Sequence, residues 1–273
     1  MVSTQANFLF GTAGWSYADW QGVVYPQPQP AGFSPLRFLA EDFDFVEVNT
    51  TFYRIPSQRL AQGWVRQVRD RDHFTFWVKL NQAFTHQNQG DEHLATAFKE
   101  SVQPLKESDR LAGILAQFPY SFHCLQGNLD RLKRLRDWFG QIPLAVEFRH
   151  RSWHRDAVLA FLHEHCMCWT NIDQPSISSS LPLTSLSSGC GSEYLRLHGR
   201  NAAEWFSGAG RNARYDYNYS HTELKEIAAA AVRISEKSSA PVFISGNNHY
   251  KGQAVRNLKS LKQVIESMLP GTG

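Results

Sequence analysis

The chain of 273 residues is long enough for one large domain, and its 42% hydrophobic and 19% charged residues are typical of an ordinary globular protein. A formal net charge of +3 excludes the dense basic clusters of a dedicated DNA-binding domain, and the absence of any run of about 18 apolar residues leads us to expect no membrane association. The four cysteines show neither a C-x-x-C pair nor zinc-finger spacing, which favours a reducing, cytoplasmic location.

Short apolar runs alternate with amphipathic segments along most of the chain. In chain order, the predicted strands are 7–14, 44–49, 74–80, 113–118, 143–149, 167–173, 194–199 and 241–248. The predicted helices begin at Ser34-Pro35 and then cover 57–71, 91–107, 127–139, 153–165, 220–237 and 251–269. Serine before proline is a typical helix start, and Ser220 with Glu223 forms a capping-box pattern. Strand–helix alternation of this kind predicts a parallel sheet.

One connection lacks a helical pattern. Residues 174–193 are rich in Ser, Pro and Gly, and we interpret them as a long loop that replaces the sixth helix. Eight parallel strands with right-handed crossovers can close into a TIM-type (β/α)8 barrel, for which about 250 residues is usual. The alternative is an open, doubly wound sheet. We expect one barrel domain over residues 1–273.

Polar residues share one face of several predicted strands. In the fifth strand, Glu147 and Arg149 lie on one face, while Val146 and Phe148 lie on the other. A sheet covered by helices on both sides should be apolar on both faces. A barrel instead has an interior that becomes polar at the C-terminal mouth, where barrel enzymes place their chemistry. The pattern therefore favours a closed barrel.

The same parity argument collects a set of polar residues at the predicted mouth. They are Glu47, Asn49, Lys79, Gln117, Glu147, Arg149, Asn171, Asp173, Arg196, His198, Ser245 and Asn247. Burying any of these charges alone would cost several kcal/mol, so they must pair with one another or meet a ligand. A network that only fills the barrel is one interpretation. We favour a ligand site, because the groups come from many strands and meet at one end.

The signs of these charges favour a metal-free site. Arg149, Arg196 and Lys79 would repel a cation but could hold a phosphate or carboxylate through charge-assisted hydrogen bonds. The predicted catalytic residues are Glu47, Glu147, Lys79, His198 and Asp173, with one glutamate as general acid or base. A divalent metal held by Glu47, Glu147, Asp173 and His198 is the less favoured alternative. A lysine inside a barrel either forms a Schiff base or holds an anion, and we favour the second role.

Aromatic residues occur in the predicted loops above the mouth. Trp15 follows the first strand and Tyr53 follows the second, where they either stack on a ligand or pack loop against loop. The seventh loop interleaves Arg200, Arg211 and Arg214 with aromatic residues, which is a weak indication of nucleic-acid binding. No G-x-G-x-x-G or P-loop pattern occurs, so no nucleotide cofactor is predicted.

Several motifs occur in a fixed order along the chain: GTAGWSYADW, FVEVNTTFYRIP, VKLNQAFTH, LAQFPYSF, LAVEFRHRSW, YLRLHGR and NNHYKGQAVRN. In this order they closely resemble the YecE-like family, domain of unknown function 72, over nearly the whole chain. The resemblance implies a (β/α)8-like barrel and no established reaction. The polar positions that it implies are Glu47, Asn49, Lys79, Glu147, Arg149, Arg196, His198, Asn247, Asn248 and His249.

The sequence thus predicts a metal-independent enzyme without a cofactor. It would act by general acid–base chemistry, of hydrolase, lyase or isomerase type, on a small phosphorylated or otherwise anionic molecule at the barrel mouth. The predicted substrate-binding residues are Arg149, Arg196, Asn49, Trp15, Tyr53, Asn247, Asn248 and His249. The alternatives are a nucleic-acid-binding or nuclease-like barrel, with or without a metal, and a non-catalytic ligand-binding barrel. No oligomeric state follows from the sequence.

Overall fold

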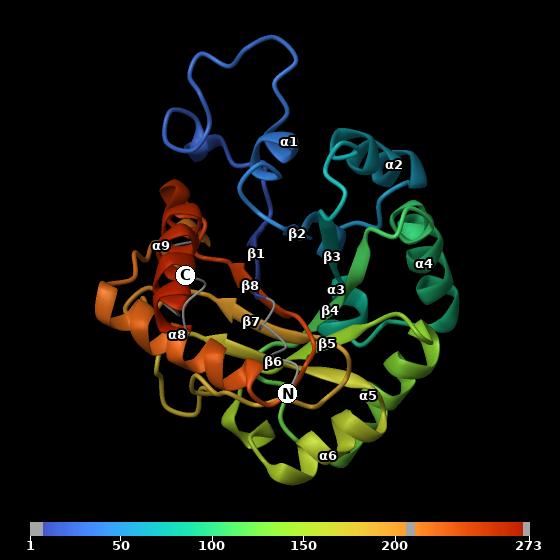
Figure 1. Ribbon diagram of the computed structural model, residues 1–273. Helices are drawn as coiled ribbons and strands as arrows, with labels where there is room; N and C mark the ends of the chain where they lie inside the picture. The colour runs from blue at the N-terminus through green and yellow to red at the C-terminus, as the bar shows by residue number, and fades with distance from the viewer. Residues whose placement is uncertain (1–7, 206–210, 270–273) are drawn as a thin grey trace, which may run out of the picture.

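The computed structural model describes residues 8–205 and 211–269, and within them eight parallel strands form a closed barrel (Figure 1). The strands are β1 (Phe8–Ala13), β2 (Phe45–Val48), β3 (Thr75–Lys79), β4 (Leu111–Gln117), β5 (Leu144–Glu147), β6 (Met167–Asp173), β7 (Glu193–Leu197) and β8 (Val242–Gly246). Each strand pairs with its neighbour in sequence, and β8 pairs with β1. The predicted TIM-type barrel is confirmed, and of the predicted strand residues only Asn7 lies outside the described part.

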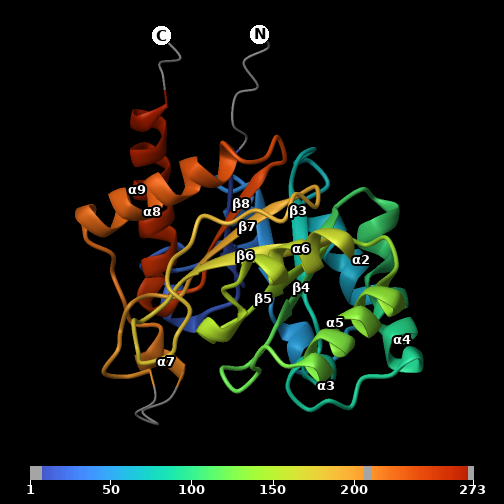
Figure 2. The same ribbon diagram turned by 90° about the horizontal axis from the view of Figure 1, so that it is seen from below.

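Helices form an outer layer around the strands (Figure 1, Figure 2). They are α1 (Pro35–Leu39), α2 (Gln58–Gln67), α3 (Gln82–Thr85), α4 (Glu92–Glu107), α5 (Gln126–Phe139), α6 (Asp156–Glu164), α7 (Arg211–Arg214), α8 (His221–Ser235) and α9 (Gln253–Met268). The sequence pattern missed α3 and α7, because four residues are too few to show a helical period. Among the described helices, none combines the length and the apolar character needed to cross a lipid bilayer.

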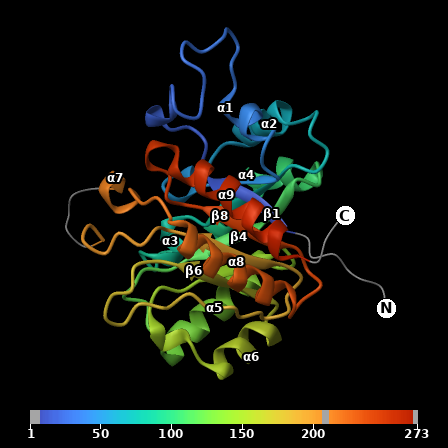
Figure 3. The same cartoon turned by 60° about the vertical axis from the view of Figure 1, so that its left-hand side comes forward.

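The predicted helix starts have the expected caps. The Ser34 side chain accepts a hydrogen bond from the Arg37 backbone, and Ser220 and Glu223 form the reciprocal bonds of a capping box. Helices α8 and α9 then lie side by side on the outside of the barrel (Figure 3). A capping side chain therefore begins α1 and α8, whereas α9 begins after Gly252 without a side-chain cap.

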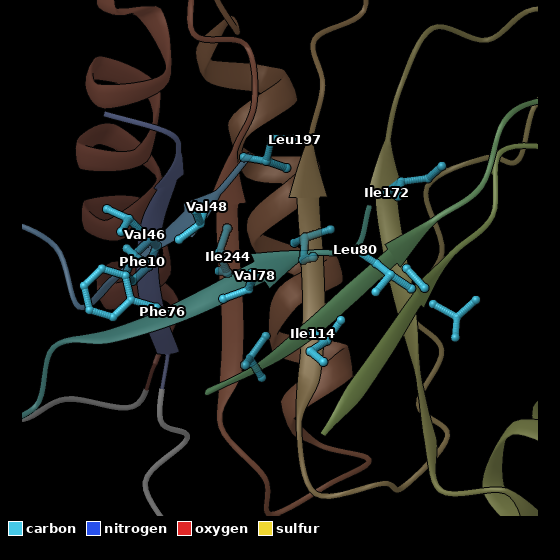
Figure 4. Packing of buried hydrophobic residues seen from close by; sticks show 14 of the residues in the cluster. Phe10, Val46, Val48, Phe76, Val78, Leu80, Ile114, Ile172, Leu197 and Ile244 are labelled. Atoms are coloured by element: carbon cyan, nitrogen blue, oxygen red, sulfur yellow. The ribbon is translucent and has the colours of Figure 1, made fainter. Parts of the chain in front are cut away.

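The outer face of the strands is apolar. Side chains such as Val46, Phe76, Val78 and Ile244 lie in one continuous core with the helices (Figure 4). A separate layer fills the barrel interior below the mouth and consists of Phe45, Trp77, Leu115, Ala145, Cys168, Tyr194 and Phe243. The interior is thus a packed core in its lower part, as in other barrels of this type.

Glycines make room for the large rings of the inner layer. A Cβ at Gly113 would lie 2.5 Å from the Trp77 ring, and a Cβ at Gly11 would lie 2.7 Å from the Phe45 ring. Both glycines are direct strand partners of the rings that fill their space. Large and small residues on adjacent strands therefore interlock, which closes the lower barrel and leaves the polar groups above it.

The connection between β6 and β7 covers residues 174–192 and contains no helix. It is held by side chains of β6 instead. Asn171 accepts hydrogen bonds from the Thr184 hydroxyl at 2.7 Å and the Leu186 amide at 2.9 Å, and it donates to the Leu186 carbonyl at 2.8 Å. These hydrogen bonds fix the loop against β6, which α6 also contacts.

The prediction that Asn171 and Asp173 face the barrel interior was wrong. Cys168 belongs to the inner layer, whereas Trp169 packs with the outer core against Phe148, with ring centroids 5.5 Å apart. The parity argument assumed that a helix covers the outer face of every strand. Because a polar loop covers β6, polar side chains can face outward there and still have partners.

Candidate functional site

Charged and polar residues from three strands meet inside the barrel at the C-terminal ends of the strands. We call Glu47, Glu147, Arg149, Arg196 and His198 the barrel network. Glu47 and Glu147 lie at or near the ends of β2 and β5, Arg196 is on β7, and Arg149 and His198 lie just beyond β5 and β7. All five side chains are buried. The structure therefore brings the central predicted residues together.

Arg196 is the centre of the barrel network. Its Nε and Nη2 atoms donate to the two Glu47 oxygens at 2.9 and 2.6 Å, and its Nη1 atom donates to Glu147. The Tyr194 hydroxyl at 3.0 Å and the Ser245 hydroxyl at 3.4 Å also donate to Glu47. A bidentate pair with two further donors saturates the Glu47 carboxylate, so this glutamate is held in one orientation.

Glu147 contacts two guanidinium groups. Arg149 Nε lies 2.6 Å from its Oε1 atom, Arg196 binds the other oxygen, and His198 Nε2 lies 3.3 Å from Oε1. Burial alone would raise the pKa of Glu147, but Arg149 and Arg196 outweigh it and hold the pKa well below its usual value. Glu147 is therefore ionised at neutral pH.

His198 is neutral, and its tautomer is fixed. Arg149 Nη2 at 3.4 Å can only donate to Nδ1, and the Asn247 amide lies 2.8 Å from the same atom. The ring proton is therefore on Nε2, which faces Glu147. Burial and then Arg149 lower the pKa of His198 to about 3. At neutral pH this histidine orients its neighbours and carries no charge.

Lys79, the last residue of β3, differs from the arginines. Its Nζ donates to Gln117 Oε1 at 2.6 Å and lies 4.3 Å from the centre of the Phe52 ring. The side chain is half-buried and lines a cavity, and within the described residues it forms no ion pair with a carboxylate. Burial, and then Arg196, lower the pKa of Lys79 to about 7, although Glu47 opposes the shift.

A cavity of about 300 Å³ lies above the barrel network. Its lining consists of Phe52, Tyr53, Lys79, His86, Gln117, Pro119, Tyr120, Arg149, Gln174, Trp205, Arg214 and Tyr215. Three of these residues are lysine or arginine, and none of the described lining residues is acidic. A larger hollow of about 790 Å³ lies between residues 50–57 and α2, and its described lining includes none of the barrel-network residues.

Aromatic and basic residues alternate along one wall of the cavity. The Trp205 ring lies 5.6 Å from the Arg149 guanidinium and 5.9 Å from that of Arg214. His86, at the end of α3, packs edge-on against Phe52 at 4.9 Å, and burial, and then Lys79, lower its pKa to about 4. Sequence reasoning did not place His86, Trp205 or Gln174 in the site. They come from loops and a short helix, where strand parity gives no information.

Asp173 does not belong to the barrel network, and its predicted place at the mouth was wrong. It faces outward on β6, where Arg200 donates to it at 2.8 to 3.1 Å and the Tyr219 hydroxyl at 2.6 Å. Burial raises the pKa of Asp173, partly offset by these hydrogen bonds. We call Asp173, Arg200 and Tyr219 the outer cluster. The outward rotation of β6 explains the error.

Asn248 and His249 have structural partners. Asn248 is fully buried and donates to the Tyr217 carbonyl and to Asn257 Oδ1, each at 2.8 Å. The His249 ring stacks on Tyr17, with centroids 4.3 Å apart. Neither residue belongs to the described lining of the cavity, although the His249 ring lies 5.3 Å from that of Tyr215, which does.

The remaining predicted substrate contacts lie in different places. Trp15 packs edge-on against Trp64 with centroids 5.9 Å apart, so it joins the outer core and not the cavity. Tyr53 is 61% exposed and lines the cavity rim. Asn49 is half-buried directly after β2 and does not cap the following turn with its side chain.

Of the residues considered as metal ligands, Glu47, Glu147 and His198 meet in the barrel network, but Asp173 does not join them. Asp173 lies in the outer cluster, and arginines occupy the carboxylates of Glu47 and Glu147. Within residues 8–205 and 211–269, no group of three or more His, Cys, Asp or Glu side chains has the geometry to hold a metal ion. The donor set at the mouth suits an anionic group better than a cation.

The fold and the site define a class: a (β/α)8 barrel with a buried ion-pair network under a basic cavity at the C-terminal mouth. The chain belongs to the family described as "Protein of unknown function DUF72", which matches residues 9–271. The resemblance to the YecE-like family is thereby confirmed.

The chain is similar to its relatives along almost its full length. The chain is 30% identical to the UPF0759 protein YunF of Bacillus subtilis (strain 168) over 271 residues, with 94% of each chain covered. Among solved structures, it is similar to a DUF72 family protein of Thermotoga maritima MSB8, with 35% identity, a TM-score of 0.82, and 95% and 99% of the two chains covered. A DUF72 family protein of Enterococcus faecalis V583 has 27% identity and a TM-score of 0.82, with 97% and 96% covered.

Proposed function

We propose that this chain is a metal-independent enzyme that binds a small phosphorylated or carboxylated molecule in the cavity at the barrel mouth. One observation carries the proposal: the cavity is lined by Lys79, Arg149 and Arg214, and none of its described lining residues is acidic. A positive, partly enclosed site attracts anions and holds them through charge-assisted hydrogen bonds. Its volume of about 300 Å³ limits the ligand to a small molecule.

The roles within the site follow from burial. Glu47 and Glu147 are fully buried and paired, so they orient Arg196 and Arg149 and do not reach the ligand themselves. Lys79 faces the cavity and has a pKa near neutrality, which is the property required of a general acid or base. We therefore assign proton transfer to Lys79 and anion binding to Arg149 and Arg214.

Calorimetric titration with inorganic phosphate and with pyruvate tests the proposal. We expect saturable binding that is lost in Arg149→Gln and weakened several-fold in Arg214→Gln. Arg134, which is exposed on α5, gives a matched control, since Arg134→Gln removes the same charge away from the cavity. Equal weakening in Arg134→Gln and Arg214→Gln would show that only net charge matters, and no binding to the wild-type protein would refute the proposal.

A nucleotide-like ligand is a second candidate, because aromatic rings line the same cavity as the cations. Tyr53, Tyr120, Trp205 and Tyr215 offer faces on which a base could stack. Oligonucleotide binding measured at several salt concentrations distinguishes this candidate. Phosphate-backbone contacts give an affinity that falls steeply with salt, whereas a single bound anion gives a shallow dependence.

A further inference from the structure

We propose that Lys79 forms a Schiff base with the carbonyl carbon of a small aldehyde or ketone that carries a carboxylate or phosphate group. The inference rests on the proposed function, since it uses the same cavity and names the chemical class of its substrate. It gives Lys79 a covalent role in addition to the proton transfer assigned above, and it favours the Schiff base that the sequence left as the alternative to anion binding. The groups that are left to pair with Lys79 decide whether its nitrogen can react.

The carboxylates nearest to Lys79 are already occupied. Glu47 is bound by Nε and Nη2 of Arg196, and Glu147 is shared between Arg196 and Arg149. The partner of Lys79 Nζ is the neutral amide oxygen of Gln117 at 2.6 Å. The lysine can therefore lose its proton without breaking an ion pair, which is the condition that a nucleophilic amine requires.

The groups facing Lys79 move its pKa in opposite directions. They come from β2, α3, β5, β7 and the segment after β5, namely Glu47, His86, Glu147, Arg196 and Arg149. Burial and then Arg196 outweigh the two glutamates, and the pKa of Lys79 falls to about 7. About half of the amine is then free at pH 7, whereas an ordinary lysine has fewer than roughly one free amine in a thousand.

The cavity presents the substrate in a suitable orientation. Arg149 and Arg214 can hold the anionic end of the molecule, and their guanidinium groups lie 5.6 and 5.9 Å from the Trp205 ring. The Lys79 nitrogen lies on the same cavity surface, at the carboxyl end of β3, and can attack a carbonyl carbon placed above it. Holding both reactants in one small site replaces a bimolecular encounter with an intramolecular one.

The reaction balances without any further reagent. The unprotonated Lys79 nitrogen attacks the carbonyl carbon and forms a carbinolamine. The oxygen then leaves as water with the two hydrogens of the amine, and a carbon–nitrogen double bond forms. Protonation of this imine from solvent gives an iminium, whose N–H can donate to Gln117 Oε1 as the ammonium does now. The Phe52 ring, 4.3 Å from Nζ, lies where it can stabilise the cation.

Reductive trapping tests the inference directly. The full-length protein is incubated at pH 7 with glyoxylate, pyruvate or dihydroxyacetone phosphate and sodium cyanoborohydride, and the labelled lysine is located by peptide mass spectrometry. We expect a single adduct on Lys79, on the order of tenfold or more above any other lysine. Similar labelling of Lys79 and of exposed lysines would overturn the inference.

Three variants make the test specific. Lys79→Arg should abolish the adduct, while Lys99→Arg, which replaces a lysine on α4 that donates to the Trp138 carbonyl, should leave it unchanged. Arg214→Gln keeps Lys79 and should reduce trapping of pyruvate several-fold without changing trapping of the neutral ketone hydroxyacetone. Equal effects on both ketones would contradict the assigned orientation.

Calorimetry and reductive trapping together separate the proposed anion site from the proposed Schiff base. If phosphate and pyruvate bind in the calorimeter but no adduct forms on Lys79, the anion site stands and the Schiff base is refuted. If neither anion binds and an adduct forms only with neutral carbonyl compounds, the anion site is refuted, and with it the substrate class named here.

Discussion

Two carboxylate–arginine clusters lie at the carboxyl ends of the strands, one on each side of the barrel wall. Glu147 in the barrel network and Asp173 in the outer cluster are both buried, at 0% and 2% exposure, yet their pKa values move in opposite directions. Burial raises both. Glu147 has two guanidinium groups, whereas Asp173 has one, which it shares with Glu223 and with Glu226.

The comparison shows that the number of cations per carboxylate, and not burial, decides in which direction the pKa moves. The outer cluster is complete, because every member has a partner and none faces a cavity. The barrel network carries more positive than negative groups once Lys79 is counted, and the excess faces the cavity. The excess distinguishes a site that can accept an anion from a cluster that only stabilises the fold.

The largest expected effect follows replacement of Glu147. Glu147→Gln keeps the shape but leaves Arg149 without its carboxylate in a buried place, and should lower the free energy of unfolding by about 3–5 kcal/mol. Arg149 is only 7% exposed, so water can reach the orphaned guanidinium from the cavity side alone. Urea unfolding measures the change, and a loss below about 1 kcal/mol would mean that the network is solvated.

The same variant has a defined pH dependence. Because the folded pKa of Glu147 is lowered, its contribution to stability is present above the unfolded value of about 4.3 and is lost as pH falls through the folded pKa. The difference between wild type and Glu147→Gln should therefore shrink on acidification below about pH 4. A difference that stays constant down to pH 2 would contradict the assigned pKa direction.

Asp173→Asn is the matched change in the outer cluster and should cost less, about 1–2 kcal/mol. Arg200 keeps Glu226 at 2.9 Å, and its side chain is 25% exposed, so water can cover it. The pKa of Asp173 is raised in the folded protein, so its ionisation costs stability as pH rises above about 3.9. Anion binding in the cavity should not change, and a change would show that the two clusters communicate.

Lys79→Met should change the way in which the free energy of unfolding depends on pH. Because the folded pKa of Lys79 is about 7, the unfolded chain binds more protons between about pH 7 and 10. The stability of the wild type should therefore rise relative to Lys79→Met over this range, by on the order of 1–2 kcal/mol, since the open cavity screens part of the effect. Unfolding at pH 6, 7.5 and 9 measures it, and an unchanged difference would indicate an ordinary lysine.

The smallest expected change in the free energy of unfolding is at an exposed ion pair. Arg37 and Asp70 lie 2.5 Å apart, but their side chains are 59% and 42% exposed. Arg37→Gln should change the free energy of unfolding by about 0.5 kcal/mol or less. If this change were as large as that of Glu147→Gln, the contrast between buried and exposed pairs would not explain the barrel network.

Sequence reasoning was reliable where alternation of side chains along a strand decides the outcome. Strand parity alone places Glu47, Glu147, Arg149, Arg196 and His198 inside one mouth, because each lies two residues from another inward residue. Strand parity assigned the wrong faces to β6, because a loop covers the polar side chains on its outer face.

Loops and short helices were beyond the reach of periodicity. His86 and Trp205 line the cavity, but nothing in the spacing of their neighbours indicates which way a loop turns. Trp15, by contrast, was predicted as a substrate contact and packs into the outer core. The chemistry of a loop residue depends on tertiary contacts that a single sequence does not encode.

The loop of residues 174–192 has a consequence for dynamics. Hydrogen bonds to β6, and not an apolar helix face, hold much of it, so we expect a lower free energy of local opening than for α5, with faster amide hydrogen exchange. Its first residue, Gln174, donates to the Arg149 carbonyl at 3.1 Å and accepts from the Arg149 guanidinium at 3.1 Å. An anion that binds Arg149 should therefore slow exchange in the loop, and the loop amides would report occupancy of the cavity without any label.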